Sequence, residues 1–198
     1  PPRSTLFPYT TLFRSASDSN APSGTASGMI NSIGLENVGA RAFLTEKLPY
    51  LAELGVSVWV NFFGEDRDSY VECARMLEAG AGQGIDVLEM NISCPNIKKG
   101  GIEFGTVPEV AHELTRRCVE ATSIPIVVKL TPNAADVPAM AQAVFEADLK
   151  QYPMNGWSTF GLAEAMSALG DEAGAKKVLD RFETLWQFAD VTLSTSIL

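Results

Sequence analysis

The segment from Asn91 to Asn96 combines residue types that could carry chemistry on a flat heterocycle. A cysteine, Cys94, lies between the asparagines Asn91 and Asn96 and is followed by Pro95. A thiol with an ordinary pKa of about 8.5 can act as a base once it is activated. Carboxamides both donate and accept hydrogen bonds, which suits a ring with alternating N–H and C=O groups. The segment therefore points to proton abstraction from a bound heterocycle, with Cys94 as the base.

The residues around this segment favour a site on a loop. Gly100, Gly101 and Gly105 follow it and would let the chain fold closely over a ligand. The alternative is that Cys94 is a buried small hydrophobe, which is the usual fate of a free cysteine. Pro95 and the flanking asparagines favour the loop site over this alternative.

The remaining sulphur-bearing and titratable residues offer fewer candidates. Cys73 and Cys118 lie within helical patterns and are interpreted as core thiols. Three cysteines in all are too few and too scattered for a disulfide framework or a zinc site. The single histidine, His112, lies in a helical pattern and is assigned no chemistry. We therefore expect no metal centre.

The elements that must position these residues alternate between strand and helix. Strands are expected at 56–63, 86–92 and 125–130, and helices at 39–54, 67–80, 107–122 and 134–147. A strand followed by a helix, three times running, implies parallel strands with right-handed crossovers. We therefore expect an α/β fold that forms part of a (β/α)8 TIM barrel, because a complete barrel typically takes about 250 residues.

Each expected strand has a polar residue at or near its C-terminal end. These residues are Asn61, Asn91 and Lys129. In a (β/α)8 barrel the C-terminal ends of the strands carry the active site. Two simpler roles stay open: Asn61 could cap the following helix, and Lys129 could extend into solvent from the edge of a barrel.

Four separate segments resemble class 1 dihydroorotate dehydrogenases, in the order and at the spacing of that family. They are Asn31-Ser32-Ile33-Gly34-Leu35, Asn61, the Asn91–Asn96 segment with its following glycines, and Lys129. The resemblance covers about residues 29–140. It implies FMN as the cofactor and the oxidation of dihydroorotate to orotate, a step of pyrimidine biosynthesis.

The resemblance also implies a role for each matching residue. Cys94 would remove the C5 proton of dihydroorotate while C6 delivers a hydride to FMN. The substrate contacts would come from Asn31, Ser32, Ile33, Gly34, Leu35, Asn91 and Asn96. The flavin contacts would come from Asn61, Asn91 and Lys129.

Two details refine the resemblance. Related dihydropyrimidine dehydrogenases tend to have a histidine after the Cys-Pro pair, so Asn96 favours orotate. The Gly100-Gly101 and Phe104-Gly105 pairs look more like the NAD-linked subtype, which works with a separate iron–sulphur flavoprotein subunit.

The composition changes on both sides of residues 29–147. Residues 1–15 resemble translated sequencing adapter, and residues 1–28 are expected to be a disordered leader. Residues 148–198 are expected to form a helical hairpin and tail that resemble the end of a tetratricopeptide-repeat protein. An ordinary hairpin that closes a domain is the alternative.

The shifts in composition suggest a chimera that joins two unrelated segments. Such a chimera would bind FMN poorly and be inactive. The rival function is that of a non-enzymatic interaction protein that uses the hairpin.

Charge and hydropathy bear on the partners. Fifteen Lys and Arg against 24 Asp and Glu give a net charge of −9, which argues against nucleic acid or an anionic membrane as a partner. No apolar run approaches the roughly 20 residues that a membrane helix needs. The small number of cysteines makes a reducing cytoplasm the expected location.

Overall fold

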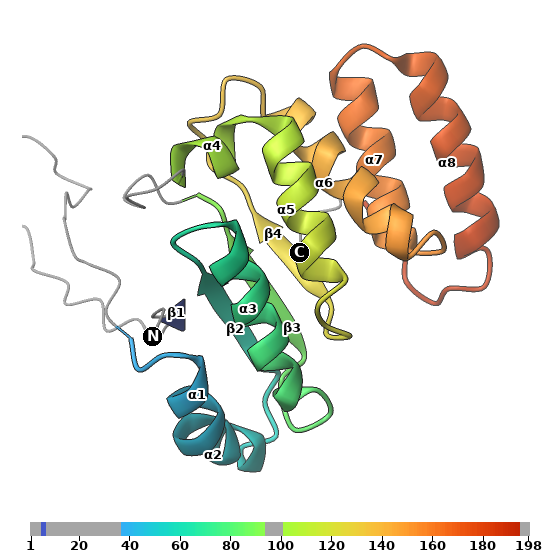
Figure 1. Cartoon of the computed structure of the whole chain (residues 1–198). Coiled ribbons are helices and arrows are strands. Elements are labelled where there is room, and N and C mark those ends of the chain that lie inside the picture. Colours follow the sequence, from blue (N-terminus) through green and yellow to red (C-terminus); the bar gives the residue numbers. More distant parts are fainter. Residues whose placement is uncertain (1–4, 7–36, 94–100, 195–198) are drawn as a thin grey trace, which may run out of the picture.

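The computed structural model describes residues 5–6, 37–93 and 101–194, with backbone alone for 5–6 and 101–102. Its centre is a sheet in the order β1-β2-β3-β4 (Figure 1). The strands β2 (Trp59–Phe63), β3 (Val87–Asn91) and β4 (Ile126–Lys129) run parallel. The sequence predicts this arrangement, although each strand is shorter at one or both ends than expected.

The short strand β1 (Thr5–Leu6) lies in a region where the sequence predicts no strand. It pairs antiparallel with β2, with Thr5 opposite Phe63 and Leu6 opposite Phe62. Two residues that carry no strand pattern of their own can add to a sheet, because the exposed edge of a strand offers unpaired N–H and C=O groups.

Helices follow the parallel strands in the expected order. The helix α3 (Arg67–Leu77) and a 3-10 turn (Glu78–Gly80) follow β2, α4 (Gly101–Thr106) and α5 (Pro108–Val119) follow β3, and α6 (Val137–Gln151) follows β4. The expected helix 39–54 is instead α1 (Ala40–Ala42), a π-helical turn (Phe43–Lys47) and α2 (Leu48–Glu53). Pro49 lies within this broken stretch, and its missing N–H removes one bond of a regular helix.

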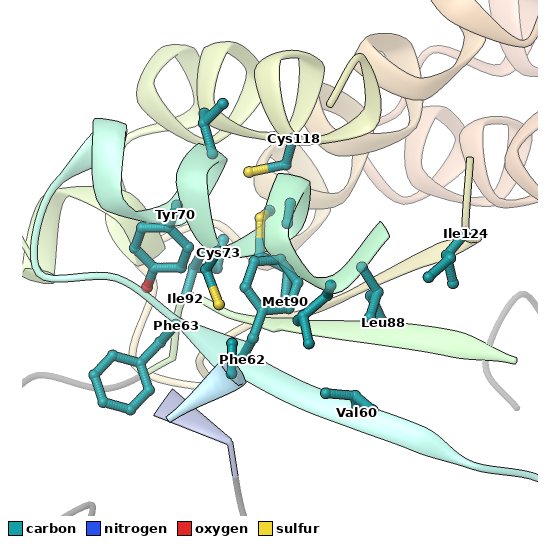
Figure 2. Close-up of a cluster of buried hydrophobic side chains, with 14 of the residues drawn as sticks. Val60, Phe62, Phe63, Tyr70, Cys73, Leu88, Met90, Ile92, Cys118 and Ile124 are labelled. Carbon is teal, nitrogen blue, oxygen red and sulfur yellow. The ribbon is translucent and has the colours of Figure 1, made fainter. Parts of the chain in front are cut away.

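One face of the sheet packs against α3 and α5 and forms the core. Side chains alternate between the two faces of a strand. One set in β2 and β3 is buried against the two helices, as Figure 2 shows: Val60, Phe62, Leu88 and Met90 from the strands, and Tyr70, Cys73 and Cys118 from the helices. Burial of each large apolar side chain contributes about 1.5–3 kcal/mol, so this face fixes the register of the strands.

The turn from β2 into α3 is tightly built. A Cβ atom on Gly64 would lie 2.4 Å from the backbone nitrogen of Tyr70, so only glycine fits. Asp66 then caps α3: its side chain accepts from the Ser69 N–H at 2.9 Å, and the Ser69 hydroxyl oxygen accepts from the Asp66 N–H at 2.9 Å. This capping box fixes where α3 begins.

The C-terminal helices pack against the rest of the chain. The helices α7 (Gly156–Ala168) and α8 (Glu172–Trp186) follow α6, and α7 contacts both α6 and α8 (Figure 1). Asp148 of α6 accepts hydrogen bonds from Ser158 at 2.6 Å and Asn155 at 2.8 Å. Because α6 continues to Gln151, the predicted boundary between residues 147 and 148 falls inside a helix. In the described part of the chain, no helix is long and apolar enough to cross a membrane.

Candidate functional site

The parallel register brings the predicted polar residues together. Asn91 is the register partner of Lys129, and Asn61 is the partner of Glu89. Register partners project from the same face of a sheet, and so do residues two apart in one strand. Asn61, Glu89, Asn91 and Lys129 therefore share the face opposite α3 and α5, toward the C-terminal ends of β2, β3 and β4.

Asn91 is held firmly at the end of β3. Its side chain is buried, with 3% of its surface exposed. Its Oδ1 atom accepts hydrogen bonds from the Ser93 hydroxyl at 2.7 Å and the Ser93 N–H at 3.1 Å. The Tyr70 hydroxyl donates to the Asn91 carbonyl oxygen at 2.7 Å. These bonds set the direction in which the chain leaves β3, three residues before Cys94.

The helix α4 supports the same strand end from another side. A Cβ atom on Gly105 would lie 2.5 Å from the Ile92 carbonyl oxygen, so glycine permits this close approach. The buried ring of Phe104 packs edge-on against Tyr70, with 5.5 Å between the ring centroids. The Phe104-Gly105 pair thus has a packing role that the sequence alone does not show.

Asn61 has one satisfied and one unsatisfied polar atom. Its Nδ2 atom donates to Glu89 Oε2 at 2.5 Å. Its Oδ1 atom is buried and has no hydrogen-bond partner among the described residues. Because a buried polar atom without a partner costs free energy, such an atom in a native structure calls for an explanation. A bound group that donates an N–H would supply the missing bond.

Lys129 places a side-chain ammonium on the same face. It ends β4 and is half-buried. A lysine ammonium has three donors and no acceptor. This face of the sheet therefore offers a carboxamide acceptor from Asn61 and a cationic donor from Lys129, which together suit a flat heterocycle that carries an N–H and a carbonyl oxygen.

The other described thiols and the histidine lie on α3 and α5, the helices that cover the opposite face of the sheet. Cys73 and Cys118 are both fully buried in the core (Figure 2), which confirms their interpretation as core thiols. Burial raises the pKa of the Cys118 thiol to about 12, so it stays protonated at neutral pH. His112 Nε2 lies 3.0 Å from Lys150 Nζ. The pKa of His112 is lowered, mainly by partial burial and secondly by the positive charge of Lys150. No group of His, Cys, Asp or Glu side chains in the described part could hold a metal ion.

Several predicted site residues lie outside the described part of the chain. They are Asn31, Ser32, Ile33, Gly34, Leu35, Cys94 and Asn96. The structure does place one residue that sequence reasoning missed, Glu89, beside Asn61. The signal that could have found it is a charged residue two positions before Asn91 in an otherwise apolar strand.

Comparison with known proteins gives a consistent result. The family described as Dihydroorotate dehydrogenase matches residues 21–161. Relatives named "Dihydroorotate dehydrogenase B (NAD(+)), catalytic subunit" include proteins of Anoxybacillus flavithermus (49% identical over 123 residues, 62% of this chain and 39% of the relative) and Pelobacter propionicus (49% over 124 residues, 62% and 40%). A Listeria monocytogenes relative of the same name is 47% identical over 121 residues, which are 61% of this chain and 39% of the relative.

The matched region includes the described strands β2, β3 and β4 and the helices from α1 to α6. The chain spans about two-fifths of the length of these curated relatives. Because the family match extends over more than half of the chain, the chain belongs to the dihydroorotate dehydrogenase family.

Proposed function

We propose that this chain carries part of the active-site rim of an FMN-dependent dihydroorotate dehydrogenase. The supporting observation is that Asn61, Asn91 and Lys129 share one sheet face: Asn91 and Lys129 end β3 and β4, and Asn61 lies two residues before the end of β2. In (β/α)8 barrels this end of the strands forms the active site. The three-stranded parallel sheet with helices on one face is consistent with part of such a barrel.

The residues present on this face fit an isoalloxazine ring. The unpartnered Asn61 Oδ1 atom can accept from a ring N–H, and Lys129 can stabilise negative charge on the pyrimidine edge of the ring. FMN, when bound, would supply the hydride acceptor. Asn91, rigidly held at the end of β3, would contact both the flavin and the substrate.

Dihydroorotate is the proposed substrate, and Cys94 the proposed base. The Cys94 thiolate would take the C5 proton of dihydroorotate, and the hydride from C6 would be transferred to the cofactor. The electron pair of the broken C5–H bond then forms the C5=C6 double bond of orotate. Asn31 to Leu35 and Asn96 would hold the pyrimidine ring so that both C–H bonds align, which is the proximity contribution.

The names of the relatives support the NAD-linked subtype. We propose that the whole enzyme passes its electrons to NAD through a separate iron–sulphur flavoprotein subunit. The location in the cytoplasm follows from the same proposal.

The polypeptide of residues 1–198 should itself bind FMN weakly and show no turnover. It spans 39% of the Anoxybacillus flavithermus relative, so most of the strands that close a barrel are outside it. A flavin phosphate that lacks its cradle of backbone N–H groups loses most of its binding free energy. For this reason we expect the polypeptide to resemble the enzyme in sequence but to lack its FMN affinity and its activity.

A titration of flavin fluorescence tests these expectations. Purified residues 1–198 are added to FMN, and orotate formation from dihydroorotate is followed in parallel. We expect quenching with an affinity weaker than micromolar and no orotate. Quenching at micromolar affinity, or measurable turnover, would show that the polypeptide is competent by itself.

The rival proposal is an interaction protein that uses α7 and α8 as a tetratricopeptide-like hairpin. The packing supports this proposal less well, because α7 is already enclosed between α6 and α8. A Cβ atom on Gly161 would lie 2.3 Å from the Phe145 ring of α6, and Phe160 packs on Phe182 of α8. Colourless protein that captures a peptide would favour the rival proposal.

A further inference from the structure

The hydrogen bond between Asn61 and Glu89 joins β2 to β3 on the candidate site face. The two residues are register partners, and Asn61 Nδ2 lies 2.5 Å from Glu89 Oε2. A glutamate carboxylate at neutral pH has acceptors only, whereas a carboxamide has a donor end and an acceptor end. The chemistry of the pair therefore requires that Asn61 turn its NH2 group toward Glu89.

This requirement fixes the other end of the carboxamide. Rotation of an asparagine amide by half a turn exchanges its oxygen and nitrogen with almost no change in shape. Beside a carboxylate the exchanged state would place two acceptors in contact, which is unfavourable. Asn61 Oδ1 is therefore held away from Glu89, and there it is buried with no donor from the residues that the structure describes.

We propose that Glu89 is a positioning residue that holds Asn61 with its Oδ1 atom presented to the N–H of a flavin ring. The identity of the ligand rests on the function proposed above. Oxidised isoalloxazine has a single ring N–H, at N3, so N3–H is the donor that matches the unpartnered oxygen. Glu89 does not touch the ligand in this account, and it acts through the orientation of Asn61.

The first test measures the orientation without any ligand. In a ¹⁵N-labelled polypeptide of residues 1–198, the side-chain amide signals of Asn61 are assigned by their loss in Asn61→Ser. We expect one of the two amide protons to be shifted downfield by the carboxylate. Glu89→Gln should move this proton upfield, because glutamine no longer requires one orientation. Glu72→Gln, an exposed change on α3, is the matched control and should leave the signal in place.

The second test measures the coupling between Glu89 and the ligand N–H. FMN and 3-methyl-FMN, which lacks the N3–H, are titrated into the wild-type chain and Glu89→Gln by following amide chemical shifts. For each chain, the affinity for FMN is divided by the affinity for 3-methyl-FMN. The bulk of the methyl group weakens binding to both chains, so the ratio of the two quotients isolates the hydrogen bond. We expect the preference for FMN to be about fivefold greater in the wild type, since a net hydrogen bond is worth about 1 kcal/mol.

The outcomes separate this proposal from the proposed function. An Asn61 signal that is identical in wild type and Glu89→Gln would overturn the positioning role, whatever the chain binds. An equal preference for FMN in both chains would overturn the link to the ligand N–H. If neither flavin shifts any signal, the flavin assignment fails for this polypeptide, and so does the presentation of Oδ1 to a flavin N–H. The amide comparison would then still decide whether Glu89 orients Asn61.

Discussion

At the scale of single residues, the candidate site depends on side chains whose orientation is set by neighbours. Ser93 orients the Asn91 side chain, Tyr70 holds the Asn91 backbone carbonyl, and Glu89 orients the Asn61 side chain. The sequence predicts Asn61 and Asn91 from their places near the ends of strands. It does not predict Tyr70 or Glu89 as their partners, because the first contact depends on how α3 packs on the sheet and the second on the register of β2 with β3.

Replacing Tyr70 by phenylalanine tests how firmly Asn91 is held. The change keeps the ring contacts with Phe62 and Phe104 but removes the hydroxyl that donates to the Asn91 carbonyl. We expect the free energy of unfolding to fall by about 1 kcal/mol, measured by urea denaturation. Tyr50→Phe is the matched control, since Tyr50 is 63% exposed, and it should change stability by less than about 0.5 kcal/mol. Equal effects of the two changes would contradict the proposed role of Tyr70.

At the scale of elements, glycine and hydrogen-bond contacts decide how helices approach the strand ends. The glycine of the Phe104-Gly105 pair lies where α4 meets the backbone at Ile92. From the sequence, this glycine is interpreted as giving freedom to a loop. In the structure it lies in a helix, and its role is close packing.

Gly105→Ala should disturb the joint between α4 and β3. The new Cβ atom would lie 2.5 Å from the Ile92 carbonyl oxygen, which cannot move without shifting the backbone. We expect a loss of about 2 kcal/mol in the free energy of unfolding. Glu103→Ala, an exposed change on the same helix, should have an effect below about 0.5 kcal/mol. A harmless Gly105→Ala would show that α4 does not pack as closely as described.

A carboxylate links the end of α3 to the approach to β4. Glu78 accepts hydrogen bonds from the Thr122 hydroxyl at 2.5 Å and from the Ser123 N–H and hydroxyl, each at 2.7 Å. These hydrogen bonds lower the pKa of Glu78; the one from Thr122 has the largest effect, and those from Ser123 come next. The folded state therefore favours the ionised form. This contribution to stability is present above the ordinary glutamate pKa and is lost as the pH falls through the lowered value.

Glu78→Gln should therefore destabilise the chain at pH 7 by about 1 kcal/mol. The difference from wild type should shrink as the pH falls below the ordinary glutamate pKa and through the lowered pKa of Glu78, because the protonated carboxyl is uncharged like the glutamine amide. Urea denaturation at several pH values measures this dependence. Glu72→Gln serves as the exposed control on α3, the helix that precedes the turn containing Glu78. A difference that stays constant across the pH range would mean that the ionised form of Glu78 is not favoured by folding.

At the scale of the whole molecule, the alternation of strand and helix predicts the parallel sheet well, because its register follows from buried apolar side chains. The broken helix near Pro49 and the added strand β1 are not predicted, because the helical pattern continues across the proline and β1 depends on pairing with the distant strand β2. The division of the chain near residue 147 remains a prediction. The structure shows α6 running through that point and bonded to the hairpin by Asp148.

Removal of residues 152–198 tests whether the hairpin is an independent unit. Truncation after Gln151 exposes the face of α6 that α7 covers, including the ring of Phe145 against Gly161. We expect a clear fall in melting temperature or in solubility, because a helix face that loses its partner exposes apolar surface. An unchanged melting temperature for the remaining chain would support two separate domains joined near residue 147.

The central claim is that the face bearing Asn61, Asn91 and Lys129 is a flavin site, and a chemical-shift map tests it most directly. FMN is titrated into ¹⁵N-labelled residues 1–198 and Lys129→Met. We expect saturable shifts centred on the C-terminal ends of β2, β3 and β4, with an affinity weaker than micromolar, and still weaker binding to Lys129→Met. Shifts centred on α7 and α8, or shifts that Lys129→Met leaves unchanged, would contradict it.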